Sequence, residues 1–246
     1  MIGKFFSKNI LGFYQRGQQI PQMTMTSIDG SLAEVLYPTL SIVQNDLERL
    51  KAILRRSMKL SMYLCSPIMF GLLAISKPLT IVLLTEKWLP SVPFMQLSCI
   101  ICLLWPLSAR LHALNAMGLS STTFKISIIS KIITLLFIVI GINISIYAIM
   151  FGTLFASIIS TLIITYYVKK YINYTYLEFF KDLFPIFIVS ILMMALVFLI
   201  GLIHINIYIR LFIQIVFEDS FYIVGSFIFK LDSINFVVSY LKNIRK

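Results

Sequence analysis

Long apolar runs constrain this chain more than any other feature of its sequence. Stretches rich in Ile, Leu, Phe and Val recur along its 246 residues. A run of about 20 such residues is what an α-helix needs to cross the hydrocarbon core of a bilayer. Charged residues make up only 13% of the chain, against about 25% in soluble domains, and the mean hydropathy is +0.92. These values exclude a water-soluble fold and predict an all-α, polytopic transmembrane helical bundle.

The runs define about seven spans, which predict one transmembrane domain over residues 1–230. Apolar residues at helical spacing among polar ones predict a cytoplasmic amphipathic tail over residues 231–246. Mixed aromatic and charged residues predict a second interfacial helix over Tyr174–Lys181. The predicted spans are Ile10–Val43, Leu60–Leu84, Val92–Leu111, Thr122–Gly141, Ile144–Val168, Leu183–Ile203 and Ile205–Phe229.

Many of the basic residues that give the chain its net charge of +11 lie in the connections between spans. Basic residues cluster in alternate connections, as the positive-inside rule requires of cytoplasmic loops, so the C-terminus is predicted to be cytoplasmic and the N-terminus to lie outside. Membrane topology accounts for the charge, and no nucleic-acid partner is predicted. The clusters are Arg49, Lys51, Arg55, Arg56 and Lys59; Lys125; Lys169, Lys170 and Lys181; and Lys242, Arg245 and Lys246.

Nothing in the sequence assembles a site for covalent chemistry. Cys99 and Cys102 form a CxxC pair, but no second pair or histidine cluster accompanies it to make a metal site. These two residues and Cys65 lie in apolar stretches and are interpreted as packing residues. The two histidines are far apart, and no glycine-rich phosphate loop is present. We therefore expect no metal, no cofactor and no enzymatic activity.

The first span is the most informative segment because polar residues interrupt it. Arg16 and Glu34 are five helical turns apart, so an unbroken helix would set them on one face about 27 Å apart, and Gln19 lies close to the same stripe. This polar side must face protein or water. Arg16, Gln19 and Glu34 are candidate substrate-binding residues, with Arg16 binding an anionic lipid head group. The alternative is that Arg16 snorkels to the outer interface.

Three further basic residues are candidates for substrate binding. Arg55 and Arg56 belong to a basic cytoplasmic loop that would collect anionic pyrophosphate groups, unless their charge only sets the topology. Lys131 lies about 12 Å along the fourth span, where it lines a cavity or reaches the interface. Arg110 and His112, at the end of the third span, are interpreted as interfacial, with a role in a proton or anion pathway as the alternative.

Several short motifs resemble one family of membrane transporters. The first group is similar to the eighth helix of Wzx-type polysaccharide flippases, which belong to the multidrug/oligosaccharidyl-lipid/polysaccharide exporter superfamily. The resemblance covers about residues 10–170 and continues more weakly to the end of the chain. The motifs are Leu11–Arg16, Pro21, Val35–Ser41, Gln44 and Asp46 in the first group, then Arg55–Arg56, Pro67 with Gly71, Lys87–Pro90 and Ala113–Gly118.

The resemblance implies one lobe of a two-lobed transporter. The family has fourteen helices in two lobes around a central cavity with alternating access, so this chain would supply helices eight to fourteen and lack an N-terminal lobe. The lipid II flippase carries an arginine at the same place that engages the lipid pyrophosphate, and Arg16 and Pro21 keep its Arg-to-Pro spacing. Acids flank that arginine, whereas Gln15 and Gln19 stand here, so ion coupling through carboxylates at these positions is not expected.

The resemblance predicts that the chain flips undecaprenyl-pyrophosphate-linked oligosaccharides across a bacterial inner membrane. The expected partners are this lipid-linked oligosaccharide, membrane lipids and the missing lobe. Three alternatives stay open. A multidrug cation exporter of the same superfamily would use Asp29 and Glu34. A membrane enzyme such as a polymerase would need a large outer loop or clustered catalytic residues. An inactive truncated fragment would do nothing alone.

Overall fold

The computed structural model describes residues 6–203 and 205–229, without the side chains at positions 31–33 and 35. This part of the chain is helical and contains no strand. The predicted tail over residues 231–246 lies outside it and stays a prediction. The elements are α1 (Lys8–Ile42), α2 (Leu47–Leu84), η2 (Glu86–Ser91), α3 (Val92–Cys102), η3 (Trp105–Ser108), α4 (Ala109–Ala116), α5 (Ser120–Ile142), α6 (Ile146–Ile172), α7 (Tyr176–Ile200) and α8 (Ile207–Ile228).

The predicted all-helical membrane bundle is confirmed. Six segments are long and apolar enough to cross a membrane: α2, the run from η2 to α4, α5, α6, α7 and α8. Each of these ends within five residues of the end of a predicted span, but α2 starts at Leu47 instead of Leu60 and α7 starts at Tyr176 instead of Leu183. α1 covers the first of the seven predicted spans, Ile10–Val43, and it is absent from the six because its residues are too polar.

Two segments differ from the sequence-based prediction. The prediction of a basic loop is wrong, because the residues from Arg49 to Lys59 form the first turns of α2. Asp46 is the N-cap of this helix and accepts a hydrogen bond from the Arg49 amide at 3.0 Å. The prediction of a separate interfacial helix over Tyr174–Lys181 is also wrong. Asn173, in the left-handed conformation, ends α6, and a capping box between Thr175 and Glu178 starts α7 two residues later.

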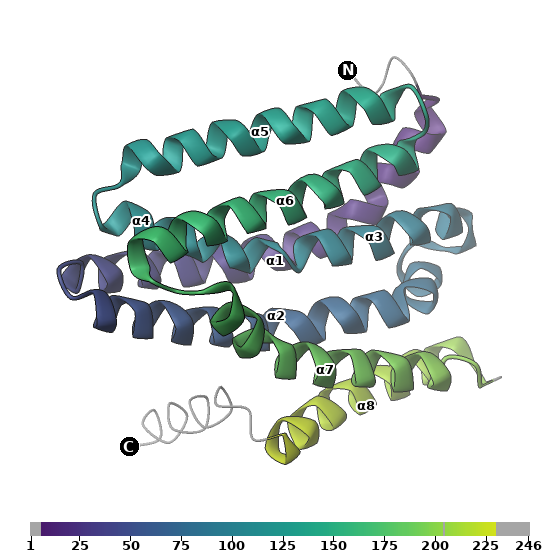
Figure 1. Ribbon diagram of the computed structural model, residues 1–246. Helices are drawn as coiled ribbons and strands as arrows, with labels where there is room; N and C mark the ends of the chain where they lie inside the picture. Colours follow the sequence, from purple (N-terminus) through teal and green to yellow (C-terminus); the bar gives the residue numbers. More distant parts are fainter. Residues whose placement is uncertain (1–5, 204, 230–246) are drawn as a thin grey trace.

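Successive long helices run antiparallel, so their connections gather at two ends of the molecule (Figure 1). We name the end that holds the α1–α2, α4–α5 and α6–α7 connections the basic end, because the lysines and arginines of early α2 lie there. η2 and the α5–α6 and α7–α8 connections form the opposite end. α5 packs chiefly on α6, α7 and α8 pack on α2, and α1 packs on α3 and α4.

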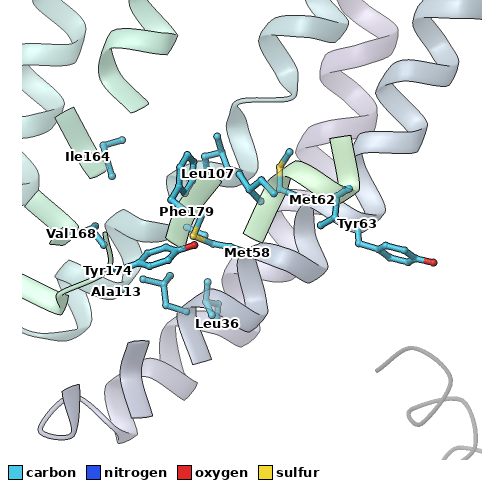
Figure 2. Packing of buried hydrophobic residues seen from close by; sticks show 14 of the residues in the cluster. Leu36, Met58, Met62, Tyr63, Leu107, Ala113, Ile164, Val168, Tyr174 and Phe179 are labelled. Atoms are coloured by element: carbon cyan, nitrogen blue, oxygen red, sulfur yellow. The ribbon is translucent and has the colours of Figure 1, made fainter. Parts of the chain in front are cut away.

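The core joins most of these helices. Figure 2 shows Leu36 of α1, Met58 and Met62 of α2, and Leu107, Ala113, Ile164 and Phe179 from later elements meeting in one cluster. The three cysteines are buried in apolar surroundings, as the sequence predicts. The outer faces stay apolar: Leu135 and Leu136 of α5 are each 57% exposed. Such surfaces suit contact with lipid chains, since exposure of this kind is unfavourable in water.

Candidate functional site

α1 has two unlike faces. Its buried face, made of Gly17, Pro21, Met25, Leu36 and Leu40, packs on the rest of the lobe. Gly17 permits an unusually close approach to α3, because a Cβ at this position would lie 2.6 Å from Phe94 Cβ and 2.7 Å from the Ser91 carbonyl oxygen. The helix is therefore fixed in rotation about its own axis, which determines what its other face presents.

The other face carries the polar residues that the sequence singles out. Arg16, Gln19, Ser27 and Glu34, which we name the α1 polar stripe, lie on the side of the helix away from the core, and Arg16 and Glu34 are exposed. The spacings of three, eight and seven positions keep them on one side of a helix with 3.6 residues per turn. The structure thus brings Arg16, Gln19 and Glu34 onto one surface, as predicted, although Glu34 is separated from Arg16 by five turns of helix.

Arg16 is held at the end of the lobe opposite the basic end. Its Nη1 donates a hydrogen bond to Gln19 Oε1 at 2.8 Å, and its guanidinium carbon lies 5.5 Å from the ring centroid of Trp88 in η2. A cation over an indole face is a favourable contact. This placement leaves the remaining guanidinium N–H groups on an exposed surface, where an anion can reach them.

Arg55 and Arg56, which we predicted as substrate contacts, have different surroundings. Arg55 binds Asp182 of α7 with two hydrogen bonds of 2.7 Å, from Nε to Oδ2 and from Nη2 to Oδ1. Lys59 lies 3.2 Å from Asp182 Oδ1, and Lys51 lies 2.8 Å from Glu178 Oε1. Arg55 is therefore part of an ionic lock between α2 and α7, formed by Lys51, Arg55, Lys59, Glu178 and Asp182.

Arg56 is exposed on the early turns of α2, towards the basic end, whereas Arg16 lies at the opposite end of the molecule. Its role as a substrate contact stays a prediction.

Tyr174 completes the ionic lock from the α6–α7 connection. Its hydroxyl donates a hydrogen bond to Asp182 Oδ2 at 2.9 Å, and its ring lies 5.6 Å from the Arg55 guanidinium carbon. Burial raises the pKa of the Tyr174 hydroxyl, and the adjacent Asp182 carboxylate raises it further. The hydroxyl therefore stays protonated and acts as a permanent donor to Asp182.

Lys131 lies apart from the α1 polar stripe. It is exposed on α5 beside Ile132, which is 52% exposed. α5 packs chiefly on α6, whereas α1 packs on α3, so the two residues belong to different surfaces (Figure 1). The structure does not bring Lys131 together with Arg16, and its role as a substrate contact remains a prediction.

Arg110 does not lie at the membrane interface, where we predicted it. It is completely buried instead of interfacial. Its Nε donates to the Leu107 carbonyl at 2.8 Å, Nη1 donates to Thr165 Oγ1, and its guanidinium carbon lies 4.5 Å from the Phe179 ring centroid. Sequence position near a span end suggested the interface, but η3 breaks the span before α4 and turns Arg110 inward. Within residues 6–203 and 205–229, no group of three or more metal-ligating side chains was found.

Comparisons with known proteins give a partial family match and several partial relatives. Residues 1–93 match the family described as "Polysaccharide biosynthesis protein". The chain is 32% identical over 90 residues to an uncharacterized membrane protein in the cps region of Klebsiella pneumoniae, a match that covers 37% of this chain and 19% of that protein. It is 22% identical over 145 residues to the lipopolysaccharide biosynthesis protein WzxC of Escherichia coli, covering 57% and 29%.

Two further proteins extend the comparison. The succinoglycan biosynthesis transport protein ExoT of Rhizobium meliloti is 24% identical over 135 residues, which cover 54% of this chain and 27% of that one. The structure of the lipid II flippase MurJ in its inward closed conformation superposes with a TM-score of 0.79 at 20% identity, over 95% of this chain and 50% of that one. The matches thus span less than a third of the curated relatives and half of the flippase structure.

The fold and the matches define the chain as a multi-pass membrane protein with the architecture of a flippase lobe. Residues 1–93 carry the match to the polysaccharide biosynthesis family, and the fold is that of half of the lipid II flippase structure.

Proposed function

We propose that this chain is one lobe of a flippase that moves undecaprenyl-pyrophosphate-linked oligosaccharide units across a bacterial inner membrane. The sugar units would feed lipopolysaccharide or another surface polysaccharide. Flipping changes the side of the membrane on which the substrate lies and no covalent bond, so the protein is not an enzyme. The match of residues 1–93 to a polysaccharide biosynthesis family supports this proposal, because that segment contains α1 and α2.

The observation that carries the proposal is the α1 polar stripe. A charged side chain at membrane depth is costly unless it faces water or a partner, and the stripe holds both an arginine and a glutamate. Gly17, Pro21 and Met25 occupy the opposite face, so α1 cannot rotate to bury Arg16 without losing that packing. The stripe therefore borders a water-filled vestibule or another protein surface, not lipid chains.

Within that vestibule, Arg16 is the substrate-binding group. A guanidinium binds phosphate with two parallel hydrogen bonds, and a pyrophosphate offers several acceptor oxygens. Gln19 and Trp88 each contact the guanidinium and restrict its motion, which reduces the entropy lost when the substrate binds. Glu34, five turns away, lies where the sugar hydroxyls of a long substrate would reach.

A second lobe would complete the vestibule. The chain spans half the length of the flippase structure that it resembles, and the α1 polar stripe is the surface that faces away from its own lobe. We propose that a lobe of similar architecture covers this stripe and that the present chain alone does not transport.

The proposal is tested by surface polysaccharide export in cells that lack their own flippase and produce this chain together with its second lobe. We expect Arg16→Ala to reduce export at least tenfold and to leave lipid-linked units on the cytoplasmic leaflet, while Arg16→Lys retains partial export. Arg49→Ala removes an exposed arginine outside the stripe and is the matched control. Normal export by Arg16→Ala, at equal protein level, would overturn the role of Arg16. Efflux of cationic dyes in place of sugar export would favour the multidrug exporter.

A further inference from the structure

A pocket with a largely apolar lining and three polar side chains lies between α2, α7 and α8, near the end of the lobe opposite the basic end. Its volume is about 220 Å³. Lys77 of α2 and Arg210 and Gln214 of α8 line it, together with apolar walls from Pro78, Phe198 and Leu202. The pocket is on the side of α2 that carries α7 and α8, whereas α1 packs on α3 and α4. It is therefore distinct from the α1 polar stripe, and a ligand here would be independent of the proposed flippase activity.

The polar groups of this pocket are only partly used by the protein. Gln214 is 1% exposed; its Nε2 donates to the Val197 carbonyl at 3.0 Å, but its Oε1 has no hydrogen-bond partner in the described part of the chain. Arg210 Nη1 donates to the Gly201 carbonyl at 3.2 Å, while its Nε is buried and also lacks a partner there. A buried polar atom without a partner is unfavourable, so a ligand that satisfies both atoms gains free energy.

The chemistry of the lining defines the ligand. Lys77 and Arg210 supply two positive charges, and the lining contains no carboxylate among the described residues. Gln214 Oε1 is an acceptor and therefore needs a donor on the ligand. The complementary molecule is an anion that also carries a hydroxyl group, such as a hydroxylated phosphodiester. A fully ionised phosphate monoester would satisfy the charges, but its phosphate group would offer no donor to Gln214.

The position of the pocket distinguishes between a soluble anion and a lipid. Lys77 lies seven residues before the end of α2, and Arg210 lies three residues after the start of α8, so both lie within about 10 Å of a helix end. This is the depth at which lipid phosphates meet a membrane protein. The apolar walls of Pro78, Phe198 and Leu202 suit the first carbons of acyl chains.

We propose that this pocket binds the head group of an anionic phospholipid with a free hydroxyl, of the phosphatidylglycerol class. Lys77 and Arg210 bind the phosphate, and Gln214 Oε1 accepts a hydrogen bond from the glycerol hydroxyl. The lipid joins α2, α7 and α8 at this end of the lobe, as the ionic lock joins α2 and α7 at the other.

Native mass spectrometry of the full chain in detergent tests this proposal. The probes are phosphatidylglycerol, phosphatidic acid and phosphatidylcholine with identical acyl chains, and water-soluble glycerol phosphate as competitor. We expect the protein to retain phosphatidylglycerol over phosphatidylcholine, and Arg210→Gln or Lys77→Gln to weaken that binding about tenfold, which corresponds to about 1.4 kcal/mol. Lys125→Gln, which removes an exposed cation from the start of α5, is the matched control and should leave binding unchanged.

A second variant tests the role of the hydroxyl. We expect Gln214→Leu to abolish the preference for phosphatidylglycerol over phosphatidic acid. Because this substitution also removes the hydrogen bond to Val197, the readout is the ratio of the two lipids bound by one variant, which a general loss of stability does not change. Equal phosphatidylglycerol binding by the parent chain, Arg210→Gln and Lys77→Gln would overturn the site. Displacement of the lipid by millimolar glycerol phosphate would overturn the lipid assignment in favour of a soluble phosphate ester.

Discussion

Three arginines of this lobe occupy three different environments, and each environment limits what the residue can do. Arg16 is exposed beside Trp88, Arg55 is bound to the carboxylate of Asp182, and Arg110 is enclosed by Phe179 and Thr165. Of these three, Arg16 is the most exposed, while the Arg55 guanidinium is bound to a carboxylate and the Arg110 guanidinium is buried. At the scale of single residues, this difference separates the candidate substrate contact from two residues that hold the structure together.

The ionic lock predicts a measurable coupling between Arg55 and Asp182. Asp182 is 5% exposed and Arg55 is 34% exposed, so one partner is buried while the other is partly hydrated. We therefore expect a double-mutant cycle of Arg55→Ala and Asp182→Ala to give a coupling free energy of about 1–2 kcal/mol, lower than for a fully buried pair. The measurement is reversible unfolding in mixed micelles.

Lys125→Ala is the control for this cycle, because Lys125 is exposed at the start of α5, and its coupling to Asp182→Ala should be near zero. Additive effects of the two lock substitutions would contradict the role that we assign to this pair.

The site residues show which information a sequence lacks. Arg16, Gln19 and Glu34 could be assigned to one face, because residues of one helix are related by its period alone. The partners of Arg55 could not be predicted in this way, because Asp182 is 127 positions away and pairs with Arg55 only after α7 packs on α2. One signal was available: Lys51, Arg55 and Lys59 repeat every four residues, as do Glu178 and Asp182, which indicates two complementary helix faces.

At the scale of the elements, the close contact between α1 and α3 determines the orientation of the polar stripe. Gly17 and Gly12 of α1 provide a matched pair to test it. A Cβ at Gly17 would meet Phe94 Cβ, the Ser91 carbonyl oxygen and the Met95 amide within 2.8 Å, whereas a Cβ at Gly12 meets nothing within 4 Å. Two of the atoms near Gly17 belong to the backbone, so the helices themselves must separate.

We expect Gly17→Ala to destabilise the protein by about 1–3 kcal/mol, the usual cost of overpacking. Gly12→Ala should stabilise it by about 0.5–1 kcal/mol, because alanine is the better helix former. Thermal unfolding in detergent measures both. Equal shifts of the two variants, in either direction, would show that α1 and α3 do not meet as described.

Hydropathy predicted the bounds of those helices whose outer faces are apolar, because contact with lipid favours apolar residues. α5, α6 and α8 begin and end close to the predicted spans, because their outer faces remain apolar along most of their length. Hydropathy failed at the basic end. There α2 extends 13 residues before its predicted start at Leu60 and α7 begins at Tyr176 instead of Leu183, since salt bridges and a capping box stabilise helical turns that carry many charges.

At the scale of the whole molecule, the lobe has an uneven surface. The outward faces of α5, α7 and α8 are apolar and suit lipid, while α1 presents charged and amide side chains. A lobe with one polar face inside a membrane requires something other than lipid against that face. This asymmetry links the fold to the proposed flippase activity, because transport of a charged head group requires an aqueous route.

Cysteine accessibility tests this central claim most directly. Cys65, Cys99 and Cys102 are buried and are first replaced by alanine or serine in the complete, exporting protein. Single cysteines are then placed at Gln19, Ser27 and Glu34 of the stripe, at buried Met25, and at lipid-facing Leu135 as control. A water-borne, membrane-impermeant thiol reagent should label the three stripe positions at least tenfold faster than the other two. Labelling of the stripe that is as slow as at Leu135 would contradict the account.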